Sequence, residues 1–311
     1  MATNTEIGKG TIADIDRRVA RVLKELGNPE PPLRLEDVRE ALRLDLGYYA
    51  ANDPGLAAEV IHRIRVAGIQ VFERPTILLD AIKKMSLQAL YLPDTKKILL
   101  DGSLPPLKHR WNEAHEVGHS LLPWHQDLMH GDNKHTISQG CHEKIEAEAN
   151  YAAGRLLFLR DRFDQEALSV APTIGSIKSL KDRYGNTIST TLYRFVESLG
   201  DSRAVLGVIC GHPHPRKRAP DFDSKAPCKH VICSPLFKAR FGKIDEVVVF
   251  EKIVSYCGPQ RGGLLGSAEI DLLDLNGQAQ RFIFETFFNS YDALTLGVHQ
   301  GPTPIIVPVN F

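Results

Sequence analysis

The spacing of apolar and polar positions divides the chain into a helical first part and a β-rich last part. Apolar residues recur at helical spacing over 12–26, and Gly27 follows as a stop signal. The same spacing predicts helices over 35–44 and 55–67, whereas the stretch 69–75 is typical of a strand. These segments predict that the chain begins with a mixed domain of helices and strands.

A hairpin and two longer helices are predicted next. The stretch 87–101, LQALYLPDTKKILLD, has apolar residues on both sides of a Pro-Asp-Thr turn, which is typical of two short antiparallel strands. Helical spacing then returns over 104–122, where a Pro-Pro pair suits the helix start. A polar, histidine-rich loop is expected over about 123–140, followed by a second helix over 142–159.

The pattern changes near Arg203. Before this point, two short helices are predicted around a tight turn at Gly185–Asn186. After it, five segments have β character: RAVLGVIC, KHVICSPLFKARF, DEVVVFEKIVSYC, SAEIDLLDL and QRFIFETFF. Asn276–Gly277 between the last two is a strong hairpin signal. We therefore expect an α+β protein whose last part is a separate, mostly antiparallel β domain.

The boundaries of this pattern predict three parts, at 1–160, 161–200 and 201–311, and 311 residues suffice for more than one core. Lys+Arg and Asp+Glu both number 38, so the overall charge does not favour nucleic acid or membranes. No apolar run approaches the length of a membrane span, and the N-terminus lacks the apolar region of a secretory signal. Five scattered cysteines do not resemble a disulfide framework, so we expect a cytoplasmic protein that does not contact membranes.

The stretch HRWNEAHEVGHSLL places two histidines four residues apart on a predicted helix. Positions i and i+4 share a helix face, so His115 and His119 can reach one ion. Glu116 lies about 100° around the helix, where it can touch a water on that ion but is poorly placed as a ligand. This arrangement suits peptide hydrolysis by zinc, with Glu116 as the general base. The sequence thus predicts one Zn²⁺ per chain.

The helix that follows offers a third metal ligand. Glu146 opens an E-x-x-A-N stretch, which resembles the second zinc helix of thermolysin-like enzymes. Asn150 lies four residues further, on the same face, and is a candidate to orient a ligand by a hydrogen bond. Glu143 and Glu148 are expected on a solvated face of the helix.

The histidines around the loop are rival ligands, and we expect each of them to be a surface or loop residue. They are His125, His130, His135 and His142. Trp111 and Trp124 flank the motif, and we expect them to pack in the core and at its rim.

Together these residues resemble the ImmA/IrrE family of zinc metallo-endopeptidases. That family shows a strand-turn-strand, a helix with a large apolar residue four before an H-E-x-G-H core, and an E-x-x-A-N-x-F-A helix ending in Leu-Leu. Trp111 stands at the apolar position, and Tyr151 and Ala152 depart from the usual order, with a Tyr for the expected Phe. The sequence FLRDR stands where Met-Pro usually follows Leu-Leu. These departures leave every matched site residue intact, so the resemblance implies a helical zincin-like peptidase domain.

The likeness covers about residues 12–199. LKDRYGNTISTTLYRFVESL is similar to the helix-turn-helix that follows the peptidase unit in many members, with Gly-Asn-Thr in place of the usual Gly-Val-Ser. Such members cleave or inactivate helix-turn-helix repressors and so switch on stress or transfer genes. The resemblance therefore implies a repressor as protein partner. It also implies that 201–311 is the counterpart of a sensor-like domain, often compared with GAF domains, of the IrrE branch.

A DNA-binding regulator that uses residues 174–199, with the metal site as a sensor, is an alternative function. This segment carries four basic residues, namely Lys178, Lys181, Arg183 and Arg194. Asp182 and Glu197 dilute their charge, whereas a protein that reads DNA normally has a denser basic face. The sequence therefore identifies no nucleic-acid-binding residue, and direct DNA binding is the less favoured hypothesis.

Two further alternatives stay open. The C-terminal part holds a set that could form a second metal site, namely Cys210, His212, His214, Cys228, His230 and Cys233. It lacks a C-x-x-C pair, and cysteines in strands are usually small buried apolar residues, so we favour packing roles. The other alternative is a non-catalytic sensor that keeps the fold, against which the intact motif argues.

Overall fold

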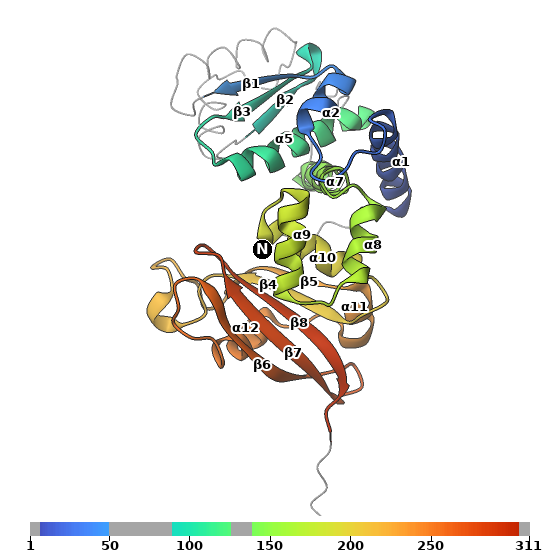
Figure 1. Cartoon of the computed structure of the whole chain (residues 1–311). Helices are drawn as coiled ribbons and strands as arrows, with labels where there is room; N and C mark the ends of the chain where they lie inside the picture. The colour runs from blue at the N-terminus through green and yellow to red at the C-terminus, as the bar shows by residue number, and fades with distance from the viewer. Residues whose placement is uncertain (1–6, 50–88, 126–138, 305–311) are drawn as a thin grey trace, which may run out of the picture. The chain divides into compact units, whose positions relative to one another are not determined.

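The computed structural model describes residues 7–49, 89–125 and 139–304. The chain divides into two compact units (Figure 1). The N-terminal unit comprises Asn4–Arg160 together with Tyr184–Asn186, and the C-terminal unit contains Asp161–Arg183 and Thr187–Phe311. This division groups the segment 161–183 with the β-rich part. The separation into three parts at 160 and 200 stays a prediction.

The N-terminal unit packs helices against a small sheet (Figure 1). Its described elements are α1 (Lys9–Glu25), α2 (Leu35–Leu42), β1 (Asp45–Tyr49), β2 (Ala89–Leu92), the 3-10 turn η1 (Pro93–Thr95), β3 (Lys97–Asp101), α5 (Pro106–Leu121) and α7 (Gln139–Leu157). The strand order among them is β1-β3-β2, with β2 antiparallel and β1 parallel to β3. The predicted hairpin is thus confirmed, whereas the expected helix at 55–67 and strand at 69–75 lie outside the described residues.

Helix α5 packs between the sheet and α7, and small side chains allow the close approach of the two helices. Ala114 of α5 and the α7 residues Ala149, Ala152 and Ala153 are fully buried. A Cβ atom added at Gly118 would lie 2.8 Å from the carbonyl oxygen of Ala149. Real Cβ atoms are not found so close to backbone oxygen, so this crossing requires glycine.

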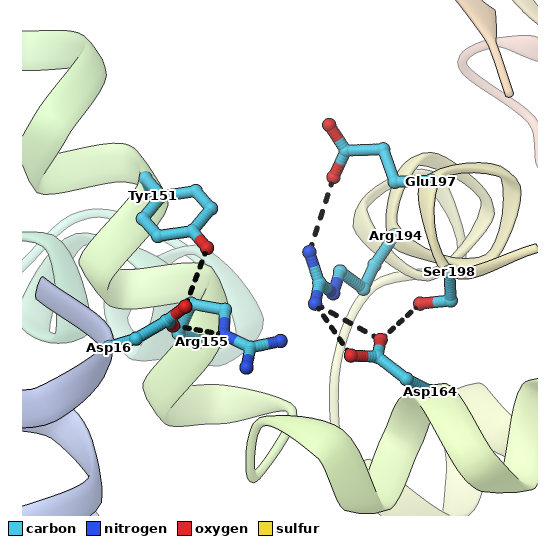
Figure 2. A network of polar contacts seen from close by, with 7 residues as sticks. All are labelled: Asp16, Tyr151, Arg155, Asp164, Arg194, Glu197 and Ser198. Atoms are coloured by element: carbon cyan, nitrogen blue, oxygen red, sulfur yellow. Dashed lines mark hydrogen bonds and ion pairs between the residues drawn. The ribbon is translucent and has the colours of Figure 1, made fainter. Parts of the chain in front are cut away.

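An ion pair and a hydrogen bond join α1 to α7. Asp16 accepts a hydrogen bond from Nε of Arg155 at 2.6 Å and from the hydroxyl of Tyr151 at 3.3 Å (Figure 2). Arg155 is largely buried, and a buried charge requires a partner of opposite charge. Asp16 is that partner. The hydroxyl group of Tyr151 therefore has a partner inside the unit.

The C-terminal unit is built on a five-stranded antiparallel sheet. Its elements are α8 (Asp161–Ser169), α9 (Ile174–Tyr184), α10 (Ile188–Ser198), β4 (Val205–Cys210), the 3-10 turn η2 (Pro215–Lys217), β5 (Cys228–Cys233), α11 (Pro235–Phe241), α12 (Glu246–Val254), β6 (Gly263–Leu273), β7 (Ala279–Phe288) and β8 (Ala293–Pro302). The strand order is β5-β4-β8-β7-β6, and Asn276–Gly277 connects β6 to β7, with Gly277 at φ 75°. The predicted α+β class and the predicted hairpin are both confirmed.

Helices cover both faces of this sheet at the end formed by β5 and β4. On one face, Leu206 and Val208 pack in a core with the phenylalanines of α11 and α12. On the other face α10 packs against β4, and a Cβ atom added at Gly207 would lie 3.0 Å from the side chain of Val196. The predicted pair of helices around Gly185–Asn186 is confirmed as α9 and α10, and the side chain of Thr187 caps α10.

Two of the segments that were expected to be strands contain helices, and that expectation was wrong. DEVVVFEKIVSYC forms α12, because the Asp245 side chain accepts hydrogen bonds from the backbone N–H groups of Val247 and Val248 and caps the helix start. The buried residues Val249, Phe250 and Ile253 then follow helical spacing toward the core. The second half of KHVICSPLFKARF forms α11, which Ser234 caps in the same way. Among the described helices, none combines the length and apolar character needed to cross a membrane.

Candidate metal centre

Three potential metal ligands from two helices converge on one point in the N-terminal unit. His115 and His119 lie one turn apart on α5, and Glu146 faces them from α7. The two Nε2 atoms are 3.1 Å apart, and Glu146 carboxylate oxygens lie 3.2 Å from Nε2 of His115 and 3.6 Å from Nε2 of His119. Among the described residues, the histidine, cysteine and carboxylate side chains that come close enough to hold one metal ion are these three.

The donor set fits zinc in both chemistry and spacing. Zinc–nitrogen distances of about 2.0–2.1 Å in a tetrahedral site separate neighbouring donors by roughly 3.3–3.4 Å. The three separations of 3.1, 3.2 and 3.6 Å bracket this value. Two imidazoles with one carboxylate form a ligand set of catalytic zinc sites, in which a fourth position stays open for water.

Asn150, which the sequence offered as a candidate to orient a ligand, lies next to His115. Its Oδ1 atom is 3.0 Å from Nδ1 of His115. Since an amide oxygen only accepts, this contact requires the proton of a neutral His115 ring to be on Nδ1. Nε2 of His115 then presents its lone pair toward His119 and Glu146.

Glu116 is buried close to these potential ligands and does not belong to the converging group. Burial raises the pKa of its carboxyl group to about 7, and the charge of Glu146 acts in the same direction. His115 and a hydrogen bond from the backbone of Tyr91 in β2 oppose this rise in pKa. The two neighbouring carboxylates favour binding of a cation, and a raised pKa makes the buried Glu116 a good proton acceptor near neutral pH.

The structure corrects the expectations for Glu148 and His125. Glu148 is only 3% exposed and not on a solvated helix face, and His125 is fully buried and not at the surface. Nε2 of His125 lies 2.9 Å from Oε2 of Glu148, and Nδ1 of His125 lies 3.0 Å from Nδ1 of His119. Burial lowers the pKa of His125, although the contact with Glu148 opposes this effect.

The remaining candidates around the motif have other positions. Trp124 donates a hydrogen bond from Nε1 to Glu148 at 2.7 Å, so it supports the buried carboxylate as well as packing at the rim. Glu143 is half-buried. His130 and His135 lie outside the described residues, as does the side chain of His142.

Sequence reasoning missed one ion pair that fixes the metal helix. Glu113, on α5, is 8% exposed and its carboxylate lies 2.6 Å from Nε of Arg39 on α2. Burial raises the pKa of Glu113, and the hydrogen bond from Arg39 opposes that rise. Glu113 also occupies a position on α5 that local periodicity would assign to solvent, and Arg39 is 74 residues away. The pairing therefore had no signal in the local pattern.

The cysteines and histidines of the C-terminal unit do not gather around one point among the described residues. Cys210, Cys228 and Cys233 belong to the core that faces α11 and α12. Nε2 of His212 bonds the carbonyl oxygen of Gln260 at 2.8 Å, and the exposed His230 lies against the ring of Tyr193 on α10. The favoured expectation of packing roles fits these contacts.

The basic residues of α9 and α10 are engaged within the C-terminal unit. Arg194 binds Asp164 at 3.0 Å and Glu197 at 3.5 Å, and Asp164 also accepts from Ser198 (Figure 2). The other three are held as well: Arg183 pairs with Glu166, Lys181 with Asp182, and Lys178 lies over the ring of Phe287. This segment therefore presents little free positive charge.

Residues 64–196 match the Peptidase M78 family model, whose description is IrrE N-terminal-like domain. This segment is similar to the IrrE N-terminal-like domain. The match includes α5, α7 and all three converging ligands. The family suggests a metallopeptidase, and the donor set described above agrees with a bound metal.

A solved structure has a similar fold. It is a Mycobacterium tuberculosis transcriptional regulator, with a TM-score of 0.54 and 15% sequence identity, and the alignment covers 96% of this chain and 77% of that chain. At this identity the likeness concerns the fold alone. No curated protein matches this chain.

Proposed function

We propose that this protein is a zinc-dependent endopeptidase that makes limited cuts in a partner protein. The observation that carries the proposal is the convergence of His115, His119 and Glu146 beside the buried carboxyl of Glu116. The IrrE N-terminal-like domain supports it, since the family model is that of a peptidase. The partner is a helix-turn-helix repressor, and the cut derepresses stress-response or mobile-element genes.

The roles of the residues follow from their positions. Zinc held by the two histidines and Glu146 would supply Lewis acidity, which activates water and polarises the scissile carbonyl group. Glu116 takes a proton from the attacking water and passes it to the leaving amine. The backbone hydrogen bond from Tyr91 fixes the Glu116 carboxylate, so the β2 strand helps to orient the general base. Asn150 holds the ring of His115.

The substrate segment binds in an extended conformation. In the described part of the sheet, β2 pairs with β3 on one side, and its backbone contacts Glu116. An extended peptide that adds as a strand beside β2 brings its carbonyl groups close to Glu116 and to the converging ligands. Such binding selects a flexible linker of a partner over a folded surface, and partner contacts outside the linker add specificity. Short peptides spanning the cut are therefore expected to be poor substrates.

The alternative of a DNA-binding regulator rests on the helix pair α9–α10 and on the fold likeness to a protein named a transcriptional regulator. The ion pairs of Lys181, Arg183 and Arg194 reduce the charge available for phosphate contacts. A salt-dependent mobility shift on DNA would favour this alternative.

The test is proteolysis by the zinc-loaded, full-length protein. It is incubated with helix-turn-helix regulators encoded near its gene and, separately, with casein as a generic unfolded protein. We expect one or a few cuts in a regulator and little digestion of casein. Rapid cleavage of casein at many sites, with no preference for any regulator, contradicts the proposal.

Glu116→Gln is the matched control for this assay. The amide keeps the size of the side chain but cannot accept the proton, so we expect hydrolysis to fall by about 10²–10⁴-fold. Zinc content should stay at one ion per chain, measured by elemental analysis of the same sample. Loss of zinc in this variant would make Glu116 a ligand and overturn the assigned mechanism.

A further inference from the structure

A chain of three buried side chains leads away from the proposed metal position on the side of His119. His119 contacts His125 through their Nδ1 atoms at 3.0 Å, and His125 contacts Glu148 through Nε2 at 2.9 Å. The exposed fractions are 3% for His119, 0% for His125 and 3% for Glu148. Because water is excluded, each proton in the chain has a defined donor and acceptor.

The protons can be assigned from the outer end of this chain. A carboxylate only accepts, so the ring of His125 donates from Nε2 to Glu148. A neutral His125 then has a bare Nδ1, which accepts the proton carried by Nδ1 of His119. Nε2 of His119 is consequently bare, and its lone pair faces Nε2 of His115 and the Glu146 carboxylate.

We propose that Glu148, acting through His125, is a positioning residue that fixes the tautomer and orientation of His119 for metal binding. This inference rests on the metal site in the proposed function. Each histidine ligand then has its own orienting group: Asn150 acts directly on His115, whereas Glu148 acts on His119 through a second imidazole. The buried carboxylate also polarises both rings and makes His119 a stronger donor.

The opposite arrangement of protons is incompatible with the metal. If His125 donated from Nδ1, then Nδ1 of His119 would have to accept and the neutral ring would carry its proton on Nε2. That proton would point into the place where the three ligands converge. Glu148 excludes this state, because a His125 ring with its proton only on Nδ1 would place a bare nitrogen against a carboxylate oxygen.

Zinc affinity of four full-length variants tests the role of Glu148 against a packing role. Glu148→Leu and His125→Phe remove the acceptors but keep side-chain volume, and we expect zinc affinity to fall by about 10–100-fold in each. Glu148→Gln keeps an acceptor oxygen for His125, so its loss should be clearly smaller. Trp124→Phe removes the other hydrogen bond to Glu148 and leaves the chain of protons intact, so its affinity should be close to that of the unmodified protein.

Competition with a chromophoric chelator gives these affinities, and circular dichroism checks that each variant is folded. A folded Glu148→Leu variant with unchanged zinc affinity would overturn the inference. Equal losses in Glu148→Leu, Glu148→Gln and Trp124→Phe would also overturn it, since they indicate a general effect of packing.

Ring nitrogen NMR of the unmodified, zinc-loaded protein gives an answer even if the variants do not fold. We expect a proton on Nδ1 of His119 and on Nε2 of His125. The reverse assignment for His125 overturns the inference. Neither measurement uses a peptide substrate, so zinc binding with the expected tautomers but without proteolysis would reject the peptidase function alone. Proteolysis with the reverse tautomers would reject the role of Glu148 alone.

Discussion

The two units of this protein both carry histidines together with other potential zinc ligands, but they arrange them differently. In the N-terminal unit, His115 and His119 share one face of α5, and Glu146 of α7 completes a compact group. In the C-terminal unit, β4 and β5 carry cysteines on the face toward α11 and α12, while His230 lies against Tyr193 on the opposite face. The presence of suitable donor residues is therefore not enough to make a metal site. On a helix, residues four apart share one face, whereas successive residues of a strand point to opposite faces of the sheet.

The surroundings of the histidine–glutamate group and of the strand cysteines also differ. Gly118 lets α5 approach α7 closely enough for the potential ligands of both helices to meet, and Asn150 and His125 lie within hydrogen-bond distance of the two histidine rings. Cys210 and Cys228 are neighbours across two strands, yet burial raises the pKa of both thiols. A thiol with a raised pKa is a poor metal ligand, because zinc binds the thiolate.

The largest expected effect is on zinc binding in Glu146→Ala. Removing one of three converging ligands should weaken zinc affinity by more than the roughly 100-fold that loss of an orienting residue costs, and should abolish hydrolysis. Glu143→Ala, one turn earlier on the same helix, is the control and should keep both. Elemental analysis and chelator competition measure the outcome. If Glu143→Ala were the zinc-poor variant, the assigned register of α7 ligands would be wrong by one turn.

Gly118→Ala tests whether close helix packing maintains the group. The new Cβ atom would lie 2.8 Å from the carbonyl oxygen of Ala149, so α5 and α7 must separate. We expect a loss of about 1–3 kcal/mol in the free energy of unfolding and weaker zinc binding. Gly154→Ala on α7 is the control, since a Cβ atom there meets nothing within 4 Å. Unchanged stability and zinc affinity in Gly118→Ala would show that the approach of the helices is not limiting.

Gly297→Ala tests whether the two units respond separately. A Cβ atom at this position of β8 would lie 2.5 Å from the ring of the buried Phe284. We expect a loss of about 1–3 kcal/mol in unfolding free energy of the C-terminal unit, with zinc affinity unchanged. Gly211→Ala serves as control, because its Cβ atom meets nothing within 4 Å. Thermal unfolding with and without zinc measures the stability of the variant and its stabilisation by zinc. If Gly297→Ala also lowered zinc affinity, the two units would not be independent.

The parts that sequence predicted well depend on local periodicity. Helical spacing across 104–122 and 142–159 located α5 and α7, and the four-residue spacing of the two histidines fixed their common face. The apolar runs around a Pro-Asp-Thr turn located the β2–β3 hairpin in the same way. In these segments, intrinsic pattern and tertiary packing favour the same structure.

The errors arose where distant partners or caps decide the outcome. Glu148 resembles a solvent-facing helix residue, but it is buried because Trp124 and His125 donate to it from 24 and 23 residues away, respectively. The valine-rich start of DEVVVFEKIV favours a strand by propensity, yet the Asp245 cap and the apolar core favour a helix. The spacing of apolar residues alone predicts neither the burial of Glu148 nor the helix cap formed by Asp245.

The most direct test of the central claim is X-ray absorption at the zinc edge of the full-length chain, loaded with one equivalent of zinc. Ligation by His115, His119 and Glu146 predicts only nitrogen and oxygen neighbours at about 2.0–2.1 Å, with the outer-shell scattering of two imidazole rings. Sulfur neighbours at about 2.3 Å would place the ion on a cysteine instead of this ligand set and contradict the account.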